Sequence, residues 1–264
     1  MATKGFDCAT PLTAQTAAAF AADGFEFVAR YLVPSGWKRL TVDEAELITA
    51  AGLQIVSVYE TTADRALGGR EAGLADGAAA IQVAKLIGQP EGSCIYFAVD
   101  FDATAVQMQA VIAYIEGAKE AADGYITGAY GSYSVVEALH ASGACSRFWQ
   151  TYAWSSGKKS AAANIYQYEN DITMNGIGVD LNESYGNEGG WNLAVDGEEE
   201  DDMALNLQYD WQWKQLGDAL DGLYHKGLIS DYTWAEKAYN RELTSSQLSW
   251  LNTIIIARQA GVQV

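Results

Sequence analysis

Acidic side chains end four short apolar runs of this sequence. Asp7 ends KGFD, Glu60 ends QIVSVYE, Asp100 ends CIYFAVD and Asp180 ends GIGVD, and Asp102 follows two residues after Asp100. Each run is β-branched or aromatic and short enough to be a buried strand. One such carboxylate often only caps the next helix, but four on separate strands are typical of a barrel with acids at the carboxyl ends of its strands. We therefore predict a catalytic site built from these five carboxylates.

The spacing of Asp100 and Asp102 suits acid–base chemistry. On an extended chain, residues i and i+2 point to the same side, roughly 6–7 Å apart. Two carboxylates so placed can divide the roles of proton donor and stabilising carboxylate when a glycosidic bond is hydrolysed. A lone DxD pair is also found in metal sites and in solvated turns. The prediction therefore depends on the apolar run before it and on the acids at the other strand ends.

Aromatic and polar side chains near these acids suggest a sugar as ligand. Aromatic rings stack on the apolar faces of sugars, while polar groups bind hydroxyls and amides. The residues that we predict to bind substrate are Arg30, Tyr31, Tyr59, Tyr130, Trp154 and Gln167. Core packing is the competing interpretation for each of the aromatic residues.

Other chemistries lack the residues that they need. His140 and His225 stand alone in helical contexts, so we predict no metal site. No Gly-rich phosphate loop is present, and we predict no cofactor. Ser132 and Ser134 have no histidine placed to activate them, which makes a serine hydrolase a poor fit.

Composition restricts the partners and the compartment. The formal net charge is −18, which disfavours nucleic acid as a partner. No apolar run approaches the roughly 18 residues of a membrane span, and the start MATKGFDCA has no signal-peptide core. The three cysteines form no disulfide framework. We expect synthesis in a reducing cytoplasm, no membrane partner, and another agent that releases the protein.

Strands alternate with helices over the first two thirds of the chain. The expected strands are 4–8, 26–32, 54–60, 94–100, 125–131, 147–153, 164–170 and 177–182, and the expected helices are 13–22, 41–51, 71–88, 104–122 and 132–142. Such alternation predicts a parallel sheet with right-handed crossovers. Eight strands close it into an α/β, TIM-type (β/α)8 barrel. Because the last gaps are short, the final helices should be reduced or absent.

The remaining chain changes character. We predict a barrel domain over 1–193, an acidic linker over 194–203 that includes DGEEEDD, and a small all-α module of three helices over 204–264. A bundle of about 60 residues is marginal alone and gains stability by association. We expect this module to serve in cell-wall targeting or oligomerisation.

The residues before Met203 suggest a second start of translation. Their acidic run requires purine-rich codons, several choices of which spell a ribosome-binding sequence just before an ATG. We predict a separate fragment from Met203 to Val264 that associates with the full chain through an apolar stripe. The stripe comprises Trp211, Leu216, Leu220, Leu223, Trp250 and Ile254–Ile256. The competing interpretation is an acidic linker with incidental codons.

Several motifs together resemble a known family. GFDCATPLT, FVARYL, IGQPEGSCIYFAVDFD, GAYGSYSVV, WQTYAWS and GVDLN are similar to the glycoside-hydrolase-like domain once called domain of unknown function 1906. That domain is similar to the family 25 muramidases, barrels that cleave the β-1,4 bond after N-acetylmuramic acid in peptidoglycan. The resemblance covers about residues 4–183 and places Asp7, Asp100 and Asp180 at the family's acidic positions. Family 25 has D-x-E after strand four, with Glu as proton donor, whereas this chain has Asp102.

The resemblance implies a peptidoglycan hydrolase, of the kind that phages use as endolysins after release through a holin-made hole. Asp102 or Glu60 would protonate the leaving oxygen. Asp100 would orient the 2-acetamido group or stabilise the oxocarbenium charge, and Asp7 and Asp180 would tune the site. Two alternatives remain: a chitinase-type glycosidase or N-acetylglucosaminidase, and a carbohydrate-binding barrel without catalysis.

Overall fold

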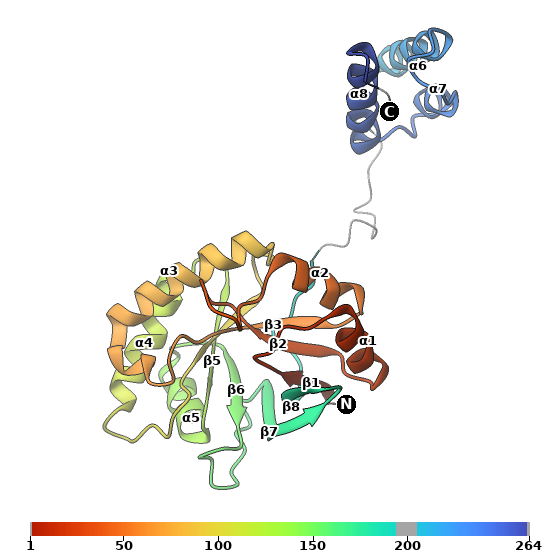
Figure 1. Cartoon of the computed structure of the whole chain (residues 1–264). Helices are drawn as coiled ribbons and strands as arrows, with labels where there is room; N and C mark the ends of the chain where they lie inside the picture. Colours follow the sequence, from red (N-terminus) through yellow and green to blue (C-terminus); the bar gives the residue numbers. More distant parts are fainter. Residues whose placement is uncertain (1, 194–204, 263–264) are drawn as a thin grey trace. The chain divides into compact units, whose positions relative to one another are not determined.

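The computed structural model describes residues 2–193 and 205–262 (Figure 1). The chain forms two compact units, Met1–Val195 and Asp196–Val264. The acidic linker expected over 194–203, and Met203 itself, lie outside the described residues.

The first unit is a mixed α/β fold around a closed barrel of eight strands. The strands are β1 (Thr3–Asp7), β2 (Phe27–Tyr31), β3 (Gln54–Tyr59), β4 (Cys94–Ala98), β5 (Ile126–Gly131), β6 (Arg147–Thr151), β7 (Ile165–Met174) and β8 (Ile177–Ser184). Each pairs with its neighbours in chain order, and β8 closes the barrel on β1. The eight expected strands are thus confirmed, with ends that differ by a few residues.

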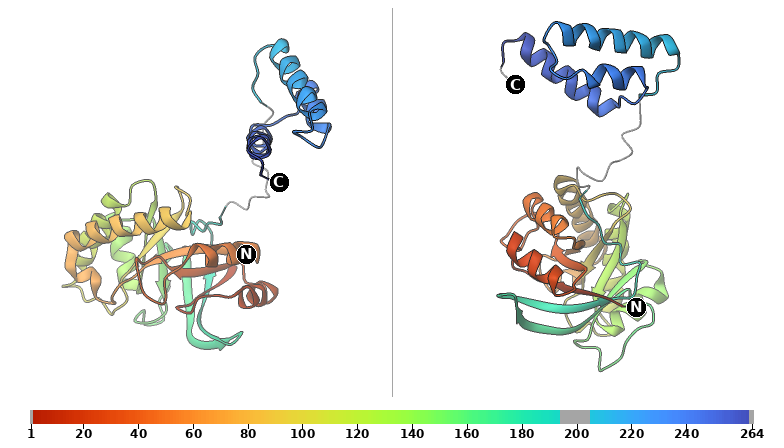
Figure 2. Two further views of the ribbon diagram at one scale, coloured as in Figure 1. Left: turned by 45° about the horizontal axis from the view of Figure 1, so that its top comes forward. Right: turned by 90° about the vertical axis from the view of Figure 1, so that its right-hand side faces the viewer.

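The direction of β8 corrects the expectation of an all-parallel barrel. β8 runs antiparallel to both β7 and β1. Only Asn175 and Gly176 separate β7 from β8, with φ of 50° and 83°. Positive φ at both positions is typical of a tight hairpin turn, and so short a connection cannot make the crossover that parallel strands need. The result is a long two-stranded ribbon, visible in Figure 2.

The helices of this unit lie outside the barrel, as Figure 1 shows. They are α1 (Ala14–Ala22), α2 (Val42–Ala50), the 3-10 helix η1 (Arg65–Gly68), α3 (Gly69–Ile87), α4 (Met108–Ala121) and α5 (Tyr133–Ser142). Thr13, Thr41 and Ser132 cap α1, α2 and α5 with their side-chain oxygens. Residues 152–164 and the β7–β8 turn are described and contain no helix, which confirms that the final helices are absent.

Side chains alternate between the barrel interior and the layer beneath the helices. Phe27, Ala29, Val56 and Val58 belong to the interior cluster. Val28 and Ile55, their neighbours in sequence, belong to the outer cluster. A Cβ added to Gly5 would lie 2.1 Å from the Phe27 ring. Large rings therefore fill the barrel, and this two-residue period decides which side chains reach its open end.

The second unit contains three helices in its described part: α6 (Asp210–His225), α7 (Thr233–Tyr239) and α8 (Ser245–Gln259). Its core includes Leu220 and Ile255, with Leu216 and Leu223 packed against it. The predicted exposed stripe is therefore wrong for these residues, because the unit's own helices cover them. Trp211, Trp250 and Ile256 do remain exposed. In neither described range is any helix long and apolar enough to cross a membrane.

Candidate active site

A pocket opens at the end of the barrel toward which β1–β7 run. Its lining residues are Asp7, Tyr31, Val58, Glu60, Ala98, Asp100, Tyr130, Trp149, Gln167 and Asp180. Each of the eight strands contributes at least one lining residue, which lies in the strand itself or within the two residues that follow it. Four of the five predicted carboxylates and three of the six predicted substrate-binding residues meet here.

The strand period explains which residues reach the pocket. Tyr31 lies two residues beyond the interior Ala29, and Glu60 and Asp100 lie two beyond the interior Val58 and Ala98. The same side of an extended chain recurs every two residues, so the apolar interior continues into these polar side chains at the mouth.

Asp7 and Asp180 face each other across the β1–β8 ladder. They are register partners in the antiparallel pairing. The Gln167 Nε2 amide donates to Asp7 Oδ2 at 2.9 Å and to Asp180 Oδ2 at 3.2 Å. Asn182 Nδ2 donates to Asp7 Oδ2 at 2.7 Å, and Trp149 Nε1 donates to Asn182 Oδ1 at 2.8 Å. The neutral amide of Gln167 thus bridges the two carboxyl groups, and that of Asn182 supports Asp7.

This environment changes the protonation of the pair. Burial, followed by repulsion from Asp180, raises the pKa of Asp7 to about 7, although the hydrogen bonds from Asn182 and Gln167 oppose the rise. Burial also raises the pKa of Asp180, against the hydrogen bond from the Asp171 backbone N–H at 2.8 Å. A carboxyl group that keeps its proton near neutral pH can donate a hydrogen bond to a ligand.

Glu60 and Asp100 form the second acidic element of the pocket. Lys38 Nζ lies 3.1 Å from Glu60 Oε2 and 3.9 Å from the centroid of the Tyr31 ring. The pKa of Asp100 is raised, first by burial and then by the Glu60 charge, while Lys38 opposes the rise. Glu60 and Asp100 thus have different surroundings, because Lys38 is paired with Glu60. Acid–base catalysis uses two carboxyl groups in such unequal environments.

Arg30 and Tyr59 are corrections to the predicted substrate-binding set. Arg30 is fully buried, and its Nε lies 2.7 Å from Glu44 Oε1. Tyr59 is buried against Phe97, with ring centroids 5.7 Å apart. Each is one residue away in sequence from a pocket residue, Tyr31 or Glu60, so the strand period turns it to the outer layer. We therefore assign neither to substrate binding.

Asp102 and Trp154 also lie apart from the pocket lining. Asp102 is exposed, because β4 ends at Ala98 and the extended geometry that would align it with Asp100 does not continue. Trp154 is 44% exposed, in the loop after β6, with a φ of 53°.

Besides the apolar Val58 and Ala98, three residues of the site were not predicted: Lys38, Trp149 and Asn182. Asn182 lies two residues beyond Asp180, so the strand period points to it. Trp149 has the same signal, since it lies two residues before the end of β6 on the interior face. Lys38 belongs to the loop between β2 and α2 and has no sequence signal.

Within residues 2–193 and 205–262, no group of three or more His, Cys, Asp or Glu side chains could hold a metal ion. Cys8, Cys94 and Cys145 are free and buried.

The closed barrel agrees with what comparison with known proteins finds. The chain belongs to the family of Rv2525c-like, glycoside hydrolase-like domains, which matches residues 18–184. The resemblance seen in the sequence is thereby confirmed.

Two solved structures of low sequence identity share the fold. The Tat-secreted protein Rv2525c of Mycobacterium tuberculosis is 24% identical, with a TM-score of 0.64 over 72% of this chain and 98% of that one. The catalytic domain of endolysin ply40, from a Listeria monocytogenes bacteriophage, is 15% identical, with a TM-score of 0.50 over 71% and 95%. At these identities the likeness concerns the fold alone.

A curated relative is similar in sequence over part of the chain. The uncharacterized protein FadG of Bacillus subtilis (strain 168) is 31% identical over 140 residues, which are 48% of this chain. The match spans 23% of FadG, so the chain covers less than a quarter of that relative's length.

Proposed function

We propose that this chain hydrolyses the β-1,4 glycosidic bonds of peptidoglycan as a muramidase-type glycoside hydrolase. The observation that carries the proposal is the mouth of the barrel, where Asp7, Glu60, Asp100 and Asp180 from four strands share one pocket with aromatic rings. Similarity in fold to a phage endolysin and to the modular autolysin LytC of Streptococcus pneumoniae supports it.

In this proposal, Asp100 is the proton donor. Burial and the Glu60 charge favour its protonated form, and an acid with a raised pKa is suited to protonate a leaving oxygen. Glu60 then remains to stabilise the positive charge that develops on the sugar. This assignment differs from the sequence-based choice between Asp102 and Glu60, because Asp102 does not line the pocket and Glu60 is paired with Lys38.

Asp7 and Asp180 hold the sugar in this mechanism. With its pKa near 7, Asp7 keeps a proton that can be donated to a hydroxyl or acetamido oxygen. Tyr31 and Tyr130 offer rings for the apolar face of the sugar. Gln167 is fixed by the Tyr130 hydroxyl, which donates to its Oε1 at 3.0 Å, so its amide stays directed at the two acids.

A barrel that binds carbohydrate without cleaving it is the second candidate. The observation that favours it is the exposed Asp102, at the position where the family 25 muramidases have their catalytic Glu. A weakly active or inactive site would leave the sugar-binding residues in place.

Product analysis on purified peptidoglycan tests both candidates. We expect new muramic acid reducing ends with the parent protein and at least a hundredfold slower release with Asp100→Asn, since loss of general acid catalysis costs about 10²–10⁴-fold. Asp123→Asn, an exposed site outside the pocket, is the matched control. New glucosamine ends would indicate a glucosaminidase instead. No new ends, with binding retained, would establish the non-catalytic barrel.

For the second unit, we propose a role in cell-wall targeting or self-association, supplied in part by an internal start at Met203. The exposed Trp211, Trp250 and Ile256 support a surface that contacts another molecule. Mass spectrometry of the expressed protein is the test. We expect a Met203–Val264 fragment that disappears in Met203→Leu, whereas a single full-length species from the parent gene would refute internal initiation.

We further propose that the protein is made in the cytoplasm and reaches the wall by an agent such as a holin. Expression with and without a membrane-permeabilising protein, followed by turbidity, tests this. Lysis without permeabilisation would contradict it.

A further inference from the structure

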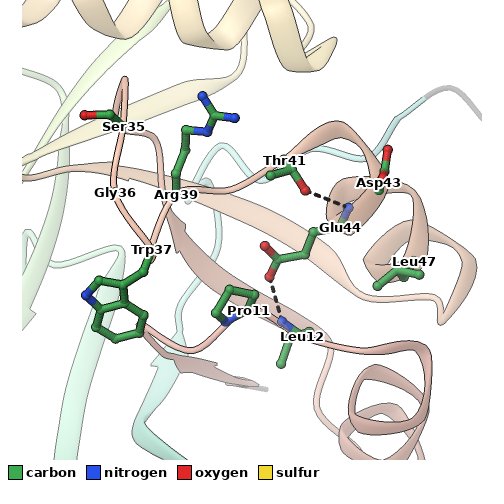
Figure 3. A pocket seen from close by; sticks show the side chains of 10 residues that line it. All are labelled: Pro11, Leu12, Ser35, Gly36, Trp37, Arg39, Thr41, Asp43, Glu44 and Leu47. Atoms are coloured by element: carbon green, nitrogen blue, oxygen red, sulfur yellow. Dashed lines mark hydrogen bonds between the residues drawn. The ribbon is translucent and has the colours of Figure 1, made fainter.

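A second hollow, which shares no lining residue with the active-site pocket, is shown in Figure 3. It has a volume of about 490 Å³, within the usual range for ligand pockets. Its lining residues come from the loop after β1, the loop after β2 and the start of α2: Pro11, Leu12, Ser35, Gly36, Trp37, Arg39, Thr41, Asp43, Glu44 and Leu47.

The loop between β2 and α2 connects the hollow to the catalytic pocket. Lys38 points to Glu60 in the pocket, while its neighbours Trp37 and Arg39 line the hollow. Arg39 pairs with Tyr31 in an isolated bridge, and the Leu40 N–H donates to the Tyr31 carbonyl at 2.9 Å. Three consecutive residues of this loop thus serve both places, since Lys38 reaches the pocket and its two neighbours line the hollow.

One carboxylate of the lining, that of Glu44, already accepts hydrogen bonds from within the protein. Glu44 accepts from the Leu12 N–H at 2.8 Å and from the Arg30 guanidinium at 2.7 Å. Figure 3 shows its carboxylate turned toward Leu12. Glu44 therefore shapes the hollow and is not offered to a ligand.

The walls offer three different groups that are not so engaged. Trp37 is 70% exposed, and Pro11 and Leu47 are further apolar residues of the lining. Arg39 donates one hydrogen bond, from Nη1 to the Pro34 carbonyl at 3.1 Å. Across the described residues, neither Arg39 nor Asp43 takes part in an ion pair. The lining of the hollow thus includes a cation, an anion and an aromatic ring.

We propose that this hollow binds the stem peptide of peptidoglycan while the glycan occupies the catalytic pocket. The inference rests on the proposed function, because it names a further part of the same substrate. A stem peptide carries carboxylates for Arg39, an ammonium group for Asp43 and alanine methyl groups for the face of Trp37. A bare glycan strand has no cation and would leave Asp43 without a partner.

Direct binding tests the site independently of catalysis. The full chain is titrated with the synthetic tetrapeptide L-Ala–γ-D-Glu–L-Lys–D-Ala to millimolar concentration, and binding is followed by NMR of the peptide. We expect Arg39→Gln and Trp37→Ala each to weaken binding about tenfold or more, as expected for the loss of a charged hydrogen bond or a stacking ring. Arg70→Gln and Leu86→Ala, exposed sites on α3, are the matched controls.

Cleavage then distinguishes the peptide from the glycan as occupant. We expect Arg39→Gln and Trp37→Ala to lower kcat/KM on intact peptidoglycan about tenfold and to leave it unchanged on glycan strands stripped of stem peptides. Equal losses on both substrates would assign the hollow to glycan and overturn the inference. A parent that does not bind the tetrapeptide, or variants that bind it like the parent, would also overturn it. Peptide binding without cleavage of either substrate would instead refute the proposed function and leave the peptide site standing.

Discussion

Two clusters of buried charge involve different strands of the barrel, and they are built differently. Behind β2, Arg30 and Glu44 form an ion pair 2.7 Å apart in which opposite charges meet. At the mouth of the barrel, Asp7 and Asp180 are like charges bridged by the neutral amide of Gln167. Both clusters lie largely out of water, yet only the second has no cation among its hydrogen-bond partners in the described residues.

The difference separates charge that supports the fold from charge that is available for chemistry. Arg30 also donates to the carbonyl of Cys8 through Nη1 and to that of Lys38 through Nη2. It thereby holds the segment after Asp7 and the loop that carries Lys38, so it is a positioning residue. In the acidic cluster, by contrast, burial raises the pKa of both Asp7 and Asp180, and repulsion from Asp180 adds to the rise at Asp7. A raised pKa is the property that a catalytic carboxyl group needs.

The largest expected effect is a loss of stability when the Arg30–Glu44 ion pair is broken. Arg30→Met leaves Glu44 buried without its cation, and removal of one partner from a buried ion pair costs about 3–5 kcal/mol. Urea denaturation should show that loss in the free energy of unfolding. The double variant Arg30→Met/Glu44→Leu should recover most of it, since no charge is then left buried. A single variant within about 1 kcal/mol of the parent would show that the pair does not support the fold.

The next effect concerns Asp7 and Asp180, where we expect a change in how stability depends on pH. Unfolded Asp7 loses its proton near its ordinary pKa of 3.8, whereas folded Asp7 keeps it to about 7. At Asp7 the folded state therefore binds more protons in this window, and the contribution of Asp7 to stability falls as pH rises from about 4 to 7. Asp7→Asn removes this dependence, so its stability relative to the parent should rise across the window.

Thermal unfolding of both proteins at pH 4 and pH 8 measures this difference, with Asp123→Asn as the exposed control. If the difference in unfolding temperature between Asp7→Asn and the parent is the same at both pH values, the Asp7 carboxyl group is ionised like an exposed one.

The smallest effects are opposite shifts of the pH–rate profile at Asp100. Glu60 raises and Lys38 lowers the pKa of Asp100, with Asp180 adding to the rise. Glu60→Gln should therefore move the basic limb of kcat/KM to lower pH, and Lys38→Met should move it to higher pH. Asp102→Asn, at an exposed site, should leave the limb in place. Shifts of the same sign, or a shift in Asp102→Asn alone, would contradict Asp100 as proton donor.

Much of this barrel could be predicted from the sequence, because its signals are local. Short β-branched and aromatic runs define the eight strands, and Thr41 followed by Glu44 marks the start of α2. The alternation within these runs also contains the distinction between Tyr31 and Arg30, or between Glu60 and Tyr59. Proximity in sequence to an acid does not make a residue part of the site, since adjacent residues of a strand face opposite sides.

The remaining features depend on contacts between distant parts of the chain. The hairpin turn at Asn175 and Gly176 reverses β8, and only the pairing of β8 with β1 sets Asp180 opposite Asp7. Lys38 reaches Glu60 because contacts with β2 hold its loop in place: Arg30 donates to the Lys38 carbonyl, and Tyr31 pairs with Arg39. The residue types at the mouth of the barrel were thus determined by the sequence itself. Their charge states were decided by the tertiary structure, because burial and the spacing of like charges exist only once the strands are assembled.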